Sequence, residues 1–130
     1  KALEYLSWEP QRIEVVTGAI LTHSFSAARV PTSLEGRILQ DADRLDAIGF
    51  TGIARCFYTA GRMGSSLYDR ADPLGATRAL DDRAFALDHF PAKLFKLVDG
   101  FQTAAGRRLA AERVRVLRSF YDGMLEEIAG

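Results

Sequence analysis

Apolar residues recur at helical spacing along most of the chain. Ile13, Val16 and Ile20 follow one another at intervals of three and four residues, which places them on one face of a helix. Pro10 favours the start of that helix, because the first turn needs no N–H group from it. His23 continues the stripe at its C-terminal end.

A second helix is predicted after Thr32, which fits a capping box with Glu35 three residues later. Its apolar positions are spaced for one face, and Gly49 is expected to end it. We expect this face to pack inward. Its members are Leu34, Ile38, Ala42 and Leu45.

The remaining chain continues the helical pattern around one irregular segment. Residues 61–80 are rich in turn-forming residues and predict a loop, which is either a functional lid or a solvated surface excursion. Asp81 and Asp82 are candidate caps of the helix that follows, and Thr103 is expected to open the last helix. No alternating apolar run is bounded by hairpin residues, so the predicted fold class is all-α.

Composition narrows the possible classes of protein. The 130 residues fit a single domain over residues 1–130. The 17 basic and 17 acidic residues cancel, which argues against nucleic acid as the main partner. No run approaches the roughly 20 apolar residues that cross a membrane. The single cysteine, Cys56, excludes an intrachain disulfide, favours a cytoplasmic setting and is expected to be a buried, inert thiol.

The densest polar cluster occupies residues 40–46 and contains three carboxylates. Asp43 and Asp46 lie three residues apart and share a helix face, whereas Asp41 projects elsewhere. Asp43 is expected at the border of the buried face, where a carboxylate has to be paired, hydrogen-bonded or metal-bound. The alternative is a surface network of ion pairs with Arg37 and Arg44.

Both histidines also have two interpretations. His23 at a helix end is either a cap or satisfied core residue, or a ligand. His89 lies four residues before Lys93, and the two are either structural polar contacts or cationic contacts for a phosphate.

Residues 34–49, which contain the sequence Asp-Ala-Asp-Arg-Leu-Asp, resemble the closing metal motif of HD-domain phosphohydrolases. Four further segments strengthen the resemblance. They are the His-Ser-Phe-Ser sequence from His23, the Gly-Ile-Ala-Arg sequence from Gly52, the Leu-Asp-Asp sequence from Leu80 and the Leu-Asp-His-Phe sequence from Leu87. The resemblance covers nearly the whole chain from about Pro10.

The resemblance implies an all-helical, HD-like bundle with a divalent metal such as Mn, Mg or Fe. It assigns the closing metal ligand to Asp43, whereas the family's first histidine and its His-Asp pair have no counterpart here. They are expected before Lys1, so the chain is expected to lack the N-terminal helices of the fold. His23 would then contact the metal-bound water or a phosphate, Asp46 would orient a ligand or substrate, and His89 and Lys93 would contact substrate phosphate.

Two functional hypotheses follow. The first is a metal-dependent phosphohydrolase acting on a small phosphorylated substrate such as a nucleotide, with the missing ligands supplied by residues outside this chain. The second is a non-catalytic helical module for interaction or oligomerisation. If the first helices are absent, apolar stripes are exposed, and exposed stripes favour homo-oligomers.

Overall fold

A computed structural model describes residues 7–24 and 29–130, and its regular secondary structure in these ranges is helical. The prediction of an all-α fold is confirmed, since the described residues contain no strand and only one isolated bridge, between Ser66 and Phe85. Residues 25 and 26 of the His-Ser-Phe-Ser sequence lie outside the described ranges. The helices are α2 (Pro10–Thr22), α3 (Leu34–Asp46), α4 (Gly49–Met63), α5 (His89–Ala92), the 3-10 helix η2 (Leu94–Gly100) and α6 (Ala104–Ala129).

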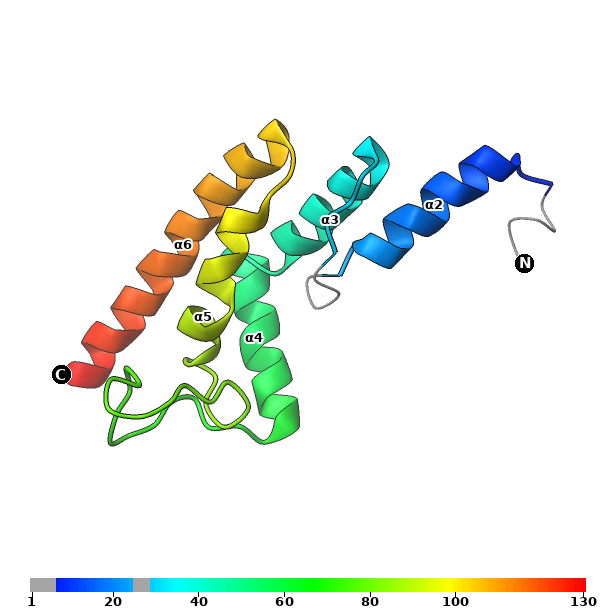
Figure 1. Ribbon diagram of the computed structural model, residues 1–130. Coiled ribbons are helices and arrows are strands. Elements are labelled where there is room, and N and C mark those ends of the chain that lie inside the picture. Colours follow the sequence, from blue (N-terminus) through cyan, green and yellow to red (C-terminus); the bar gives the residue numbers. More distant parts are fainter. Residues whose placement is uncertain (1–6, 25–28) are drawn as a thin grey trace.

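The helices form a packed body with one projecting arm (Figure 1). The long helix α6 packs against α3, α4 and η2, and η2 also contacts α5. Helix α2 packs on α3 and extends away from the other helices (Figure 1). The body therefore holds the main core, while the faces of α2 that turn away from α3 remain open.

Phe90 lies at the centre of the core and is fully buried. Its ring centroid lies 6.2 Å from that of Phe57, 5.9 Å from that of Phe120 and 5.5 Å from that of Tyr121. Ring pairs at such distances add to the apolar burial that stabilises the fold. The core therefore joins the segment around α5 to helices α4 and α6.

The helix ends follow the sequence prediction for α2 and α6 but differ from it for α3. Pro10 begins α2 as expected, and the hydroxyl of Thr103 caps α6 by accepting a hydrogen bond from the Gly106 N–H at 2.9 Å. The cap of α3 is Ser33 rather than Thr32, one residue later than predicted, because the Ser33 hydroxyl accepts from the Gly36 N–H at 3.0 Å. Gly49 begins α4 instead of ending α3, which stops at Asp46.

The prediction that the apolar face of α3 packs inward is wrong for most of the length of the helix. Leu34 is 62% exposed and Ile38 is 52% exposed, whereas Gly36, Gln40 and Asp41 are buried. The partners of α3 decide this orientation. At Gly36 a Cβ atom would lie 2.9 Å from the Pro31 side chain, so only a residue without a side chain allows this close approach.

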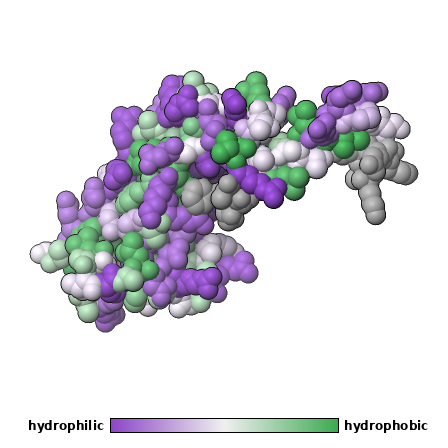
Figure 2. All heavy atoms as spheres, in the orientation of Figure 1, coloured by the Kyte–Doolittle hydropathy of each residue, from purple (hydrophilic) through white to green (hydrophobic). Residues whose placement is uncertain are grey.

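Apolar side chains consequently reach the surface along α2 and α3. Ile20 and Leu21 on α2 are more than half exposed, and Figure 2 shows hydrophobic residues at the surface along this arm. An apolar hollow of about 610 Å³ also lies along α2, lined by Trp8, Ile13 and Leu21 among others. The expectation of exposed stripes is confirmed, and the expected association of copies stays a prediction.

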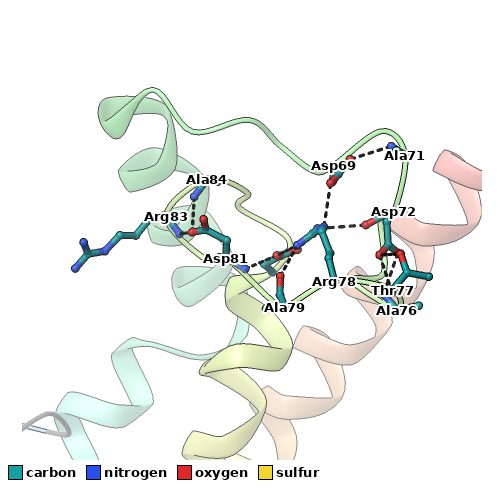
Figure 3. Close-up of polar contacts among 11 residues, drawn as sticks. Asp69, Ala71, Asp72, Ala76, Thr77, Arg78, Ala79, Asp81, Arg83 and Ala84 are labelled. Carbon is teal, nitrogen blue, oxygen red and sulfur yellow. Dashed lines mark hydrogen bonds and ion pairs between the residues drawn. The ribbon is translucent and has the colours of Figure 1, made fainter.

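The loop after α4 runs from Gly64 to Asp88, longer than the predicted 61–80, and hydrogen bonds hold it in place. Arg78 donates to both carboxylate oxygens of Asp88, at 2.5 and 3.0 Å, and forms an ion pair with Asp69 at 2.9 Å (Figure 3). The helix predicted after Asp81 does not form there. The Asp81 carboxylate caps a turn instead, accepting from the N–H groups of Arg83 and Ala84.

This arrangement predicts a pH-dependent stability. Burial by itself raises the pKa of Asp88, but hydrogen bonds from Arg78 and the Asp81 N–H, with the charge of Arg78, lower it below its ordinary value. The resulting stabilisation is complete above the unfolded-state pKa of about 3.9 and is lost as the pH falls through the lower, folded-state value.

We therefore expect Arg78→Gln to lower the free energy of unfolding at about pH 6 and to lower it less at about pH 3, where Asp88 is increasingly protonated. Urea unfolding at both pH values measures the two losses. Arg70→Gln is the control, because Arg70 is exposed on the same loop and makes no hydrogen bond or ion pair among the described residues. Equal losses at the two pH values would contradict this role for Asp88.

Candidate functional site

The three carboxylates of residues 40–46 separate into two environments. Asp43 and Asp46 are exposed on α3, whereas Asp41 is buried. Asp46 forms an ion pair with Arg55 of α4 at 2.6 Å, so its described partner lies on another helix rather than at Arg37 or Arg44. Asp43 therefore lies on open helix surface rather than at the border of the buried face, and its role as a metal ligand stays a prediction.

Asp41 has a structural role that the sequence pattern did not reveal. Its carboxylate accepts hydrogen bonds from the N–H groups of Gln102 and Thr103, at 2.7 and 2.8 Å, and from the Thr103 hydroxyl at 2.7 Å. These donors stand at the N-terminus of α6, where a negative charge is favoured. Asp41 thus fixes the start of α6 against α3.

His23 lies half-buried at the C-terminal end of α2. Its Nδ1 lies 2.6 Å from the carbonyl oxygen of Ile20, which can only accept a hydrogen bond. Nδ1 therefore carries the proton, and in the neutral ring Nε2 presents a lone pair. This contact agrees with the capping interpretation and leaves Nε2 able to serve as a ligand or hydrogen-bond acceptor.

The described residues do not form a metal centre by themselves. Within residues 7–24 and 29–130, no group of three or more His, Cys, Asp or Glu side chains is placed to hold a metal ion. Catalytic metal sites commonly use three protein ligands, which Asp43 and His23 alone do not provide. The donor set in this part of the chain therefore does not fit a firmly bound metal.

An open cavity of about 500 Å³ lies between α4, the loop before α5, and η2. His89 and Lys93 both line it, and their predicted contact with a phosphate stays a prediction. Arg55 and Arg83 also line it, although sequence reasoning gave neither a role. The sequence did contain a pattern that could have identified Arg55. Four lining residues repeat at intervals of three and four and so share one face of α4, namely Gly52, Arg55, Thr59 and Met63.

The cavity lining carries more basic than acidic side chains. Asp82 lines the cavity as well, and its carboxylate lies 2.9 Å from His89 Nδ1. Asp46 forms an ion pair with Arg55 at one edge of the cavity, so two of the basic side chains that line the cavity have an acidic partner. Cys56 also contributes to the wall, and burial, with the charge of Asp82, raises the pKa of its thiol to about 11. The thiol is therefore protonated at neutral pH, as expected for an inert cysteine.

Comparisons with known proteins identify relatives of this chain. The uncharacterised protein YpgQ of Bacillus subtilis is 37% identical over 118 residues, which make up 91% of this chain and 52% of YpgQ. The crystal structure of YpgQ in complex with ADP matches with a TM-score of 0.78 at 35% identity, covering 99% of this chain and 59% of that one. No protein-family model matches the chain.

An HD-superfamily hydrolase from Bacillus thuringiensis matches with a TM-score of 0.74 at 35% identity, covering 96% of this chain and 57% of that chain. This chain is homologous to the HD-superfamily hydrolases. It spans about half to two thirds of the length of these relatives. The resemblance stated from the sequence is therefore confirmed for a part of the HD-type domain.

Three of the segments that resemble HD hydrolases contribute residues to the cavity lining, namely those that begin at Gly52, Leu80 and Leu87. The Asp-Ala-Asp-Arg-Leu-Asp sequence occupies the end of α3, and its last residue holds Arg55 from the next segment. The Leu-Asp-His-Phe sequence carries the buried Asp88 and the cavity residue His89. Among residues 7–24 and 29–130, no helix is both long and apolar enough to span a membrane.

Proposed function

We propose that this chain is part of a metal-dependent HD-type phosphohydrolase that acts on a nucleotide or another phosphate ester. The observation that carries the proposal is the cationic cavity, in which segments homologous to HD-superfamily hydrolases place His89, Lys93 and Arg55 together. The crystallisation of the relative YpgQ with ADP supports a nucleotide as the ligand.

The roles of the candidate residues follow from their positions. His89 and Lys93 contact substrate phosphate in the cavity, and Asp46 acts through the ion pair that orients Arg55. Asp43 is one metal ligand, and His23 contacts a phosphate oxygen or a water through its free Nε2. Since these groups alone do not fit a firmly bound metal, the proposal requires further ligands from residues outside this chain.

The test compares this chain, a longer form that contains a histidine and a His-Asp pair, and Asp43→Ala in that longer form. Loss of a direct ligand is expected to lower metal content and phosphatase activity about a hundredfold or more. Metal analysis and a phosphatase screen provide the two measurements. Glu35→Ala is the matched control, because it removes an exposed carboxylate from the same helix. Unchanged metal content in Asp43→Ala overturns the assignment.

A second candidate function is a non-catalytic helical interaction module. The observation that favours it is the row of exposed apolar side chains on α2 and α3, including Ile20, Leu21, Leu34 and Ile38. The same screen separates the two, since a module of this kind binds no metal and hydrolyses no phosphate ester in any form of the protein.

A further inference from the structure

The backbone of Arg83, at the edge of the cavity, is held through both its N–H group and its carbonyl oxygen. Its N–H donates to the Asp81 carboxylate at 3.1 Å, and its carbonyl oxygen accepts from the Ser65 hydroxyl at 2.6 Å. Asp81 is itself anchored, because its N–H donates to the buried Asp88 at 2.7 Å. The position of the Arg83 backbone is therefore fixed by the loop.

The guanidinium of Arg83, in contrast, makes no hydrogen bond or ion pair with any described residue. Figure 3 shows its side chain extending away from the contacts that hold Arg78. The ammonium group of Lys93, also in the cavity lining, likewise makes none within the described ranges. The two acids at the cavity are paired with other lining residues, Asp82 with His89 and Asp46 with Arg55.

Two cations without an acidic partner in one concave site favour a bound anion. Both side chains are exposed at the open cavity, and two like charges on one concave surface add their attraction for an anion. An arginine presents its N–H groups in a planar fork that matches two oxygens of one phosphate. A ligand carrying phosphate groups satisfies both the charge and the geometry of this cavity.

We propose that Arg83 is an anion-contacting residue of this cavity and that Arg78 is the positioning residue that holds it there. The proposal deepens the proposed function and rests on it for the identity of the cavity as the phosphate site. Arg78 acts through a continuous chain of contacts, from Arg78 to Asp88, from Asp88 to Asp81 and from Asp81 to Arg83. The guanidinium of Arg78 also lies 4.6 Å from the ring centroid of Phe85, which fixes the same part of the loop.

Isothermal titration of this chain with ADP in the presence of EDTA tests the assignment of Arg83. We expect Arg83→Gln to weaken ADP binding about tenfold or more, the effect of losing one charge-assisted contact. The matched control is Arg62→Gln, because Arg62 is an exposed arginine on α4 that lies over Tyr58 and outside the cavity lining. Equal ADP affinity of Arg83→Gln and the wild type overturns the proposal, as does a wild-type chain that binds no ADP.

A double-mutant cycle tests the positioning role of Arg78. Arg78→Gln is expected to weaken ADP binding in the wild-type background and to add no further loss in the Arg83→Gln background. Additive losses overturn the role of Arg78, since they mean that it acts independently of Arg83. Because EDTA removes metal ions, the titration depends neither on Asp43 nor on hydrolysis. A failure of the metal and phosphatase assays is thereby distinguished from a failure of this proposal.

Discussion

Replacing Phe90 by alanine is expected to lower the free energy of unfolding by about 3–5 kcal/mol. The ring is fully buried and packs against Phe57, Phe95, Phe120 and Tyr121, so its removal leaves a cavity among side chains from several elements. A domain of this size has a total stability of about 5–15 kcal/mol, so this one change removes a large share of it.

Phe50→Ala is the matched control for Phe90→Ala. Phe50 is on α4 and is 78% exposed, so its truncation is expected to change the free energy of unfolding by less than about 0.5 kcal/mol. Urea unfolding followed by circular dichroism measures both variants. A cost below about 1 kcal/mol for Phe90→Ala would mean that Phe90 is not the centre of the core.

Replacing Asp41 by alanine is expected to cost about 2–4 kcal/mol of stability, although the change is made on a helix with many exposed residues. The carboxylate is buried and accepts from two backbone N–H groups and one hydroxyl at the start of α6. Without it, these half-buried donors lose their acceptor, and α6 loses a negative charge at its N-terminus.

The comparison with Asp43→Ala makes this prediction specific. Asp43 lies two residues further on the same helix and is exposed, so its loss is expected to change stability by less than about 0.5 kcal/mol. Thermal or urea unfolding of the two variants under one set of conditions measures the difference. Equal stability of the two variants would contradict the structural role of Asp41. The pair also separates the acid that supports the fold from the acid proposed to bind metal.

The sequence pointed to those residues of the candidate site that lie close together in the chain. His89 and Lys93 are four residues apart, and the structure brings both to one cavity. Arg83 was not predictable, because it reaches the cavity through contacts between Arg78 and Asp88, which are ten residues apart in an irregular loop. No periodicity marks such a contact, since the loop has no repeating geometry.

The orientation of α3 could not be predicted from the sequence for a related reason. Its apolar positions repeat as an inward face should, yet Leu34 and Ile38 are exposed and Gln40 is buried. The buried amide of Gln40 donates to the carbonyl oxygens of Thr22, the last residue of α2, and Arg29, in the segment that joins α2 to α3. Such a contact depends on where another helix ends in space.

The amino-acid sequence by itself determined the helical class, the start of α2 at Pro10 and the capping of α6 by Thr103. These features depend on spacing and on hydrogen bonds between residues close in the chain, and both can be predicted from neighbouring residues in the sequence. Tertiary structure alone decided that Asp41 supports α6, that Asp46 pairs with Arg55 and that Arg83 lines the cavity. These outcomes depend on which faces of separate elements meet, and packing of the whole chain fixes them.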